Sequence, residues 1–125
     1  MLSIYSIIVT YNGIEWIEKN IQALIDSSTK TEIIIIDNGS VDGTQDIVKS
    51  FKEVQFIQTE ENLGFGKANN IGIKKALDEG TDYVFLLNQD AYVEANTIGK
   101  LIEVMESDKK IGIARNRWNL HPIPL

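Results

Sequence analysis

Short apolar runs alternate along this chain with segments in which apolar residues recur every three or four positions. Four runs have the length of a strand, namely Ile4 to Val9, Ile33 to Ile36, Val54 to Ile57 and Tyr83 to Leu87. The isoleucine run lacks polar alternation, which is typical of a strand covered on both faces. Helical spacing follows each run, in the groups Ile14, Ile17, Ile21, Leu24 and Ile25, then Ile47, Val48 and Phe51, then Ala68, Ile71, Gly72 and Ala76, and finally Ile98, Leu101, Ile102 and Met105.

This βαβαβαβα order predicts an α/β fold with a mostly parallel open sheet and helices on both of its faces. The 125 residues fit a single domain, 1–125. Asp42 with Gln45 resembles a capping box and predicts the start of the second helix. Ile111 to Ala114 is a candidate fifth strand, and Arg115 to Leu125 is expected to be loosely ordered or extended.

The composition excludes several kinds of chemistry. The chain has no cysteine and one histidine, His121, which excludes thiolate sites, cysteine nucleophiles and multi-histidine metal sites within it. Twelve basic residues stand against eighteen acidic ones, a net charge of -6, which argues against nucleic acid as a partner. No apolar run approaches the roughly 20 residues of a membrane span, and the N-terminus lacks the basic flank of a signal peptide. We therefore expect a cytoplasmic protein with no transmembrane segment.

Polar clusters come directly or shortly after the predicted strands. They are Thr10, Tyr11 and Asn12; Asp37, Asn38, Gly39 and Ser40; Asn62, Gly64, Gly66, Asn69 and Asn70; and Asn88, Gln89 and Asp90. Parallel strands end at one edge of a sheet, and ligands bind outside that edge where the strand order reverses. We therefore expect Tyr11, Asp37, Asn38 and Asp90 to converge on one pocket.

The residues by themselves leave two interpretations open at several of these positions. Asp90 is either a ligand of Mg²⁺ or Mn²⁺ held mainly by phosphate, or a cap of a helix that starts near Glu94. Asp37 is either a turn former or a hydrogen-bond acceptor for a base or ribose. Tyr11 is either a core aromatic or a platform for a planar base. Trp16 is interpreted as a packing residue.

The third cluster is equally open. Gly64 and Gly66 either permit a positive φ or a close helix approach, or they cradle a phosphate or ribose at a helix N-terminus. Asn69 and Asn70 weaken the helix that contains them, which either capping or ligand contact explains. The chain has no P-loop and no Gly-x-Ser-x-Gly elbow, and Asn69 stands where a dinucleotide fingerprint needs its third glycine.

Four ordered segments resemble the family 2 glycosyltransferases of GT-A fold. They are SIYSIIVTYN at Ser3 to Asn12, IIIIDNGSVDGT at Ile33 to Thr44, ENLGFGKANNIG at Glu61 to Gly72 and FLLNQDAYV at Phe85 to Val93. Within that family the chain is similar to the rhamnosyltransferase-like and polysaccharide-assembly branch. The resemblance implies the N-terminal, Rossmann-like, nucleotide-binding half of such an enzyme and a role in cell-surface polysaccharide synthesis, peripheral at the inner face of the membrane.

The same resemblance implies a nucleotide-diphospho-sugar donor, inverting transfer to a hydroxyl of a glycan or lipid-linked acceptor, and a divalent metal, Mn²⁺ or Mg²⁺. Base and ribose would be held by Thr10, Tyr11, Asp37 and Asn38. The segment 62–70 would flank the nucleotide and the sugar. The metal ligand would be Asp90, in the family's Asp-x-Asp position, where Asn88 replaces the first Asp. The implied nucleotide-binding residues are Thr10, Tyr11, Asn12, Asp37, Asn38, Ser40, Asn62, Gly64, Asn69 and Asn88.

Family members continue well beyond this length, and their second half supplies the acceptor site and the general base. The chain is therefore expected to be a partial catalytic domain with no identified catalytic residue, which binds nucleotide weakly and transfers sugar poorly or not at all. The alternative is a noncatalytic nucleotide-binding or interaction module, in which an exposed apolar face favours a homodimer. A nucleotidyltransferase ranks lower, because Thr10 to Gly13 is not a basic glycine-rich loop.

Overall fold

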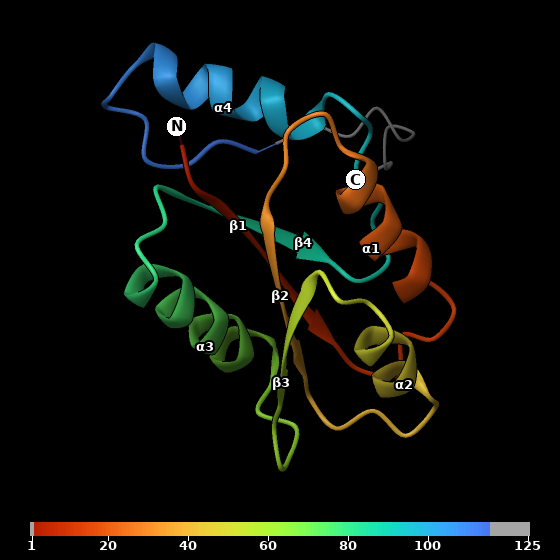
Figure 1. Cartoon of the computed structure of the whole chain (residues 1–125). Helices are drawn as coiled ribbons and strands as arrows, with labels where there is room; N and C mark the ends of the chain where they lie inside the picture. Colours follow the sequence, from red (N-terminus) through yellow and green to blue (C-terminus); the bar gives the residue numbers. More distant parts are fainter. Residues whose placement is uncertain (1, 116–125) are drawn as a thin grey trace, which may run out of the picture.

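A computed structural model describes residues 2–115, in which strands and helices alternate strictly (Figure 1). The strands are β1 (Ile4–Thr10), β2 (Glu32–Asp37), β3 (Val54–Gln58) and β4 (Tyr83–Asn88). The helices are α1 (Ile17–Asp26), α2 (Thr44–Lys49), α3 (Phe65–Asp78) and α4 (Thr97–Ser107). The predicted βαβαβαβα order is confirmed.

The strands form one sheet in the order β3-β2-β1-β4, and every neighbouring pair is parallel. The register pairs Thr10 with Asp37, Asp37 with Gln58, and Val9 with Asn88. All strands therefore end at one edge of the sheet. The order reverses at β1, because β2 lies on one side of it and β4 on the other, so the crevice beyond β1 and β4 is the expected ligand position.

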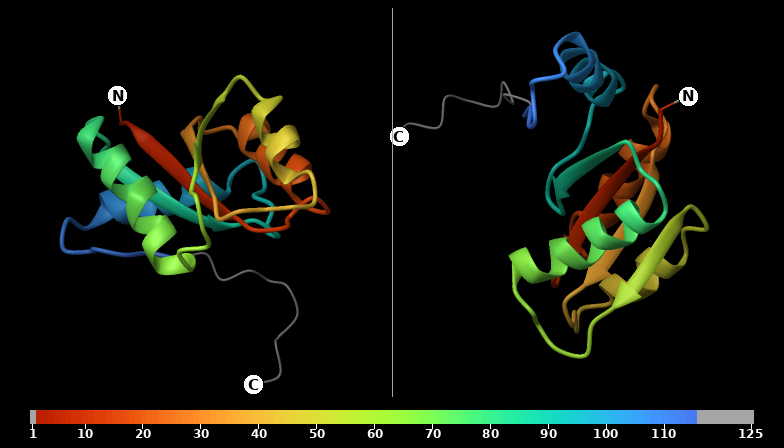
Figure 2. Two further views of the ribbon diagram at one scale, coloured as in Figure 1. Left: turned by 90° about the horizontal axis from the view of Figure 1, so that it is seen from below. Right: turned by 90° about the vertical axis from the view of Figure 1, so that its left-hand side faces the viewer.

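Helices cover both faces of the sheet, as predicted. On one face Ile33 and Ile35 pack in a core with residues of α1, α2 and α4, and on the other Ile34 and Ile36 pack in a core with residues of α3. Figure 2 shows α3 on the opposite side of the strands from α1 and α2. Neither face of β2 meets water, which explains why its isoleucines are not interrupted by polar residues.

Gly72 allows α3 to lie close to the sheet. A Cβ at this position would lie 2.5 Å from Ile7 Cγ2 and 2.7 Å from Ile36 Cδ1, and both isoleucines are fully buried. Gly72→Ala is therefore expected to lower the free energy of unfolding by about 1–3 kcal/mol through overpacking. Urea denaturation followed by circular dichroism measures the change.

The matched control is Gly66→Ala in the same helix. No atom lies within 4 Å of the Cβ position of Gly66. The greater helix propensity of alanine is then expected to leave stability unchanged or to raise it by up to about 1 kcal/mol. Equal destabilisation by both substitutions would contradict the close contact at Gly72.

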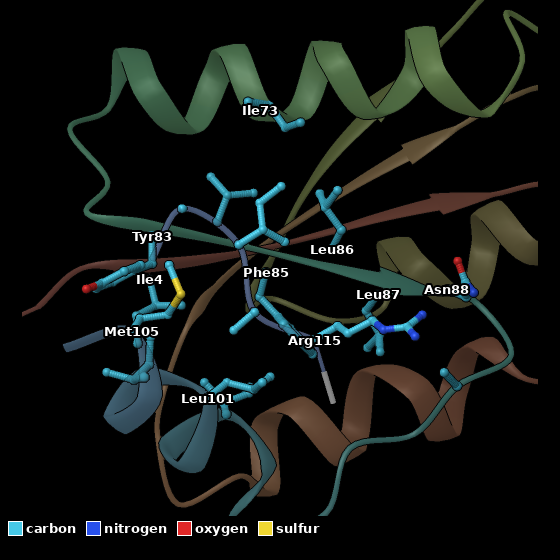
Figure 3. A pocket seen from close by; sticks show the side chains of 17 residues that line it. Ile4, Ile73, Tyr83, Phe85, Leu86, Leu87, Asn88, Leu101, Met105 and Arg115 are labelled. Atoms are coloured by element: carbon cyan, nitrogen blue, oxygen red, sulfur yellow. The ribbon is translucent and has the colours of Figure 1, made fainter. Parts of the chain in front are cut away.

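One side of β4 has no partner strand within residues 2–115. A groove of about 560 Å³ runs along this edge, with Ile73 of α3 on one side and Leu101 of α4 on the other (Figure 3). Leu86 of β4 is 49% exposed. Most of the lining is apolar, so the groove does not have the character of the expected polar site.

The predicted helix starts need correction. The first helix begins at Ile17 and not near Ile14, because residues 14–16 form a separate turn in which the Gly13 carbonyl accepts from the backbone N–H groups of Trp16 and Ile17. The capping box at Asp42 is wrong, since the N-cap of α2 is Gly43, which has a φ of 98° and makes no side-chain cap bond.

The proposed fifth strand is also wrong, because residues 111–114 are irregular. The expectation for the C-terminal segment concerns residues 116–125, which lie outside the described residues. Among the helices of residues 2–115, none combines the length and the apolarity needed to cross a membrane.

Candidate functional site

The loops after β1 and β2 are joined by hydrogen bonds at the carboxyl edge of the sheet. The backbone N–H of Asn12 donates to Ser40 Oγ at 2.8 Å, and Asn12 Oδ1 accepts from the backbone N–H of Val41 at 2.8 Å. Asn12 has a φ of 47°, a conformation that asparagine tolerates better than most residues. The backbone N–H of Gly13 donates to Thr44 Oγ1 at 3.0 Å. These bonds hold the first two loops as one unit.

The buried side chain of Asp37 stabilises this unit of two loops. Its Oδ1 accepts from Thr10 Oγ1 at 2.7 Å and from Ser40 Oγ, and its Oδ2 accepts from the backbone N–H groups of Gly39 and Ser40 at 3.1 and 2.9 Å and from Gln58 Nε2 at 3.0 Å. Burial by itself raises the pKa of Asp37, but the bonds from Ser40, Thr10 and Gln58 outweigh it and lower the pKa below its ordinary value. The turn-forming interpretation of Asp37 is confirmed, and its carboxylate is completely buried.

Asn38 ties the segment before α3 to the same edge. Its Oδ1 accepts from the backbone N–H of Leu63 at 3.3 Å, and its Nδ2 donates to the Gly64 carbonyl at 3.2 Å. Gly64 has a φ of 83°, as the positive-φ interpretation expected, whereas Gly66 lies within α3. Asn62 Oδ1 accepts from the backbone N–H of Gly64 at 2.8 Å. The third loop is thereby placed beside the first two.

A polar cavity of about 450 Å³ lies among these loops. It is lined by Val9, Tyr11, Trp16, Asn38, Asn62, Gly64, Phe65, Asn88, Gln89 and Asp90. Tyr11 is 46% exposed and Phe65 58% exposed, so aromatic surface is available in the cavity. The lining comes from the ends of β1, β2 and β4 and the start of α3, which is the position that the strand order indicates.

The Asn88–Asp90 segment brings a carboxylate to the cavity. Asp90 is exposed and its side chain makes no hydrogen bond or ion pair within the described residues. It does not cap α4, which begins at Thr97 with Asn96 as its N-cap, so the capping interpretation is wrong.

The donor set of this segment fits a divalent cation held mainly by phosphate. No group of three or more His, Asp or Glu side chains lies together within residues 2–115, so protein carboxylates alone do not form a complete cation site. One free carboxylate with nearby amide oxygens is what Mg²⁺ or Mn²⁺ uses when the remaining ligands are phosphate and water. Asp90 and Asn88 are the residues available to it.

The structure brings some of the expected residues together and not others. Tyr11, Asn38, Asn62, Gly64, Asn88 and Asp90 line the cavity. The other expected residues do not line the cavity. Thr10, Asp37 and Ser40 are buried in the interior, and Asn12 joins the loops after β1 and β2. Asn69 is also buried, and its Nδ2 donates to the Phe65 carbonyl at 3.2 Å, so it does not cap α3. Of the four residues expected to converge on one pocket, Tyr11, Asn38 and Asp90 line the cavity, whereas Asp37 is buried and does not line it.

Sequence reasoning missed three contributors. Trp16 lines the cavity instead of only packing, and Phe65 lies in it beside Gly64. Asn20 is completely buried in α1, where its Nδ2 donates to the carbonyls of Asn88 and Ala91. A polar residue on an apolar helix face, three positions after Ile17, was the signal that could have identified it.

Fold and site together define an open, parallel α/β protein with a polar cavity at its carboxyl edge. A family model, Glycosyl transferase family 2, matches residues 5–119. The chain belongs to this family. The predicted family and its GT-A fold are confirmed.

Two curated relatives illustrate the match. A dTDP-rhamnosyl transferase, RfbF of Shigella flexneri, is 29% identical over 97% of this chain and 42% of its own length. The poly-beta-1,6-N-acetyl-D-glucosamine synthase of Staphylococcus aureus is 37% identical over 85% of this chain and 26% of its own length. The chain thus spans less than half of either relative.

Solved structures share the fold. S. aureus TarS 1–349 in complex with UDP-GlcNAc superposes with a TM-score of 0.74 at 21% identity, over 91% of this chain and 37% of that one. The mannosyltransferase PcManGT of Pyrobaculum calidifontis, in complex with GDP-Man and Mn²⁺, gives 0.72 at 20% identity, over 90% of this chain and 35% of that one.

Proposed function

We propose that this chain is the nucleotide-binding half of an inverting glycosyltransferase that uses a nucleotide-diphospho-sugar in cell-surface polysaccharide synthesis. The observation that carries the proposal is the single cavity shared by Tyr11, Asn38 and Asp90 in a family 2 chain. The acceptor is a hydroxyl of a glycan or a lipid-linked glycan. Residues 1–125 act as one nucleotide-sugar-binding domain, in the cytoplasm and peripherally at the inner face of the membrane.

Each side chain has a defined role in this proposal. Tyr11 stacks on the base, because its ring is exposed in the cavity and planar bases bind aromatic faces. Asn38 and Asn62 hold the loop that passes the ribose, and Gly64 allows that loop its left-handed turn. Thr10, Asp37 and Ser40 act indirectly by keeping the first two loops in place.

Asp90, with Asn88, would hold the divalent metal. A bound Mn²⁺ or Mg²⁺ would supply positive charge that stabilises the departing nucleoside diphosphate. The acceptor hydroxyl also needs a general base, and no side chain of the described cavity is assigned that role. We therefore expect nucleotide binding without efficient sugar transfer by this chain.

Calorimetric titration tests the proposal. The chain is titrated with UDP, dTDP and GDP, each with and without Mn²⁺. One nucleotide is expected to bind weakly. Its affinity is expected to depend on Mn²⁺, because without the cation the negative Asp90 carboxylate repels the negative diphosphate. No heat with any of the three would contradict the proposal.

The open edge of β4 favours a second candidate function, an interaction module that pairs with a second copy of the chain. Leu86 is half exposed on this edge, and the groove beside it is mostly apolar. The chain would then elute from a sizing column at twice its 14.0 kDa. Leu86→Lys, which places a charge on the edge, would restore the monomer.

A further inference from the structure

The side chain of Gln89 bridges the diverging ends of β1 and β4. Its Oε1 accepts from the backbone N–H of Tyr11 at 3.0 Å, and its Nε2 donates to the Tyr11 carbonyl at 3.1 Å. The last pair of the two strands in register is Val9 with Asn88. Beyond it, the Gln89 amide satisfies both backbone groups of Tyr11, as strand neighbours would inside a sheet.

Gly13 leaves room for this amide. A Cβ at position 13 would lie 2.3 Å from Gln89 Oε1 and 2.8 Å from Gln89 Cδ. Gly13 is not among the residues with positive φ. An added Cβ would therefore displace the amide at the end of the flexible Gln89 side chain from its bonds with Tyr11, while the backbone conformation of Gly13 would accept it.

Asn20 holds the same segment from the inside. Its Nδ2 donates to the Asn88 carbonyl at 3.0 Å and to the Ala91 carbonyl at 2.8 Å, and the backbone N–H of Ala91 donates to the Asn88 carbonyl at 3.1 Å. Asn20 Oδ1 is buried and has no hydrogen-bond partner among the described residues. Two amides, one at the rim and one in the interior, thus anchor the backbone on both sides of Asp90.

The side chain of Asp90 makes no hydrogen bond or ion pair within residues 2–115, so what the structure holds in place is the backbone that carries it. We propose that Gln89 is a positioning residue that sets the spacing between the backbone of Tyr11 and the backbone of Asp90, and so the positions from which the ring and the carboxylate reach the cavity. This proposal rests on the proposed function: Tyr11 faces the base and Asp90 the diphosphate of one nucleotide. Because the backbone is anchored at both positions, the two ends of the nucleotide meet partners whose spacing needs little adjustment on binding.

A double-mutant cycle tests the proposal, with Gly13→Ala, Gln89→Ala and the double variant. Binding of UDP with Mg²⁺ is followed by amide NMR titration, and the same samples report the hydrogen exchange of the Tyr11 amide without nucleotide. Each single variant is expected to weaken UDP binding about tenfold, the loss of roughly one net hydrogen bond. Each is also expected to speed up Tyr11 exchange.

The double variant is expected to bind UDP as tightly as Gln89→Ala alone, because the added Cβ then meets no amide. Gln22→Ala is the control: its exposed side chain, which donates to Asp26 at 3.0 Å, lies outside the cavity, so UDP binding and Tyr11 exchange should stay as in the wild type. Urea midpoints confirm that every variant is folded.

The possible failures are distinct. Two outcomes would overturn the positioning role of Gln89: affinity losses that add in the double variant, or unchanged Tyr11 exchange in Gln89→Ala. If the wild type still binds UDP in these cases, the proposed function stands. A wild-type chain that binds none of UDP, dTDP and GDP would overturn both, and if dTDP or GDP binds in place of UDP, the cycle is measured with that nucleotide.

Discussion

Asp90→Asn is expected to weaken UDP binding in the presence of Mn²⁺ by about 30-fold, or about 2 kcal/mol. The carboxylate is exposed in the cavity and makes no other bond within the described residues, so its substitution should cost the fold little. Its loss removes a charged contact with a cation, which is worth several kcal/mol near a protein surface before desolvation is subtracted. Calorimetric titration of both chains, with and without Mn²⁺, measures the effect.

The metal dependence is the decisive part of this result. Without Mn²⁺, Asp90→Asn is expected to bind UDP no more weakly than the wild type, because the carboxylate then only repels the diphosphate. Asp26→Asn serves as the control, since this exposed residue lies at the end of α1 and outside the cavity. Equal Mn²⁺ dependence in Asp90→Asn and wild type would remove Asp90 from the metal site.

Asp37→Asn is expected to lower the free energy of unfolding by about 3 kcal/mol at pH 7. The buried carboxylate accepts bonds from Thr10, Gly39, Ser40 and Gln58, and an amide nitrogen in its place would face donors with no acceptor to offer. Since folded domains are stable by only about 5–15 kcal/mol, the variant should remain folded but weakened. Urea denaturation followed by circular dichroism measures the loss.

The pH dependence of stability provides a second test of Asp37. The pKa of Asp37 in the folded chain is lower than its unfolded value of about 3.9. Between these two pKa values the unfolded chain therefore binds more protons than the folded chain. The contribution of Asp37 is therefore fully present above the unfolded pKa and is lost as the pH falls through the folded pKa. Below about pH 4 the wild type should lose stability more steeply than Asp37→Asn.

Asp46→Asn is the matched control for both measurements. Asp46 is exposed in the first turn of α2, so its substitution should cost only about 0.5 kcal/mol through the helix dipole. If Asp37→Asn were as stable as Asp46→Asn at pH 7, the hydrogen bonds of Asp37 would not contribute to folding.

Much of the fold was predictable because its signals are local. The isoleucines of β2 predict a strand covered on both faces, and such strands alternating with amphipathic helices predict parallel pairing. The start of α2 was not predictable in the same way. Asp42 and Gln45 have the spacing of a capping box, yet Gln45 donates to the Ser40 carbonyl and Asp42 accepts from Thr44 and from the Ile14 backbone. Neighbouring loop residues, together with Ile14 from the loop after β1, bind the groups that a capping box would have used.

Periodicity and motif order are properties of neighbouring positions, so they were enough to predict the order of the elements, the family and the edge of the sheet at which polar residues gather. Which of those residues line the cavity depends on contacts between distant parts of the chain. Asp37 and Asn38 are adjacent in the chain, but Asp37 is turned inward to Thr10 and Gln58 while Asn38 lines the cavity. The pairing of Gln89 with Tyr11, across 78 positions, likewise depends on strand register and on the space at Gly13, which no local pattern encodes.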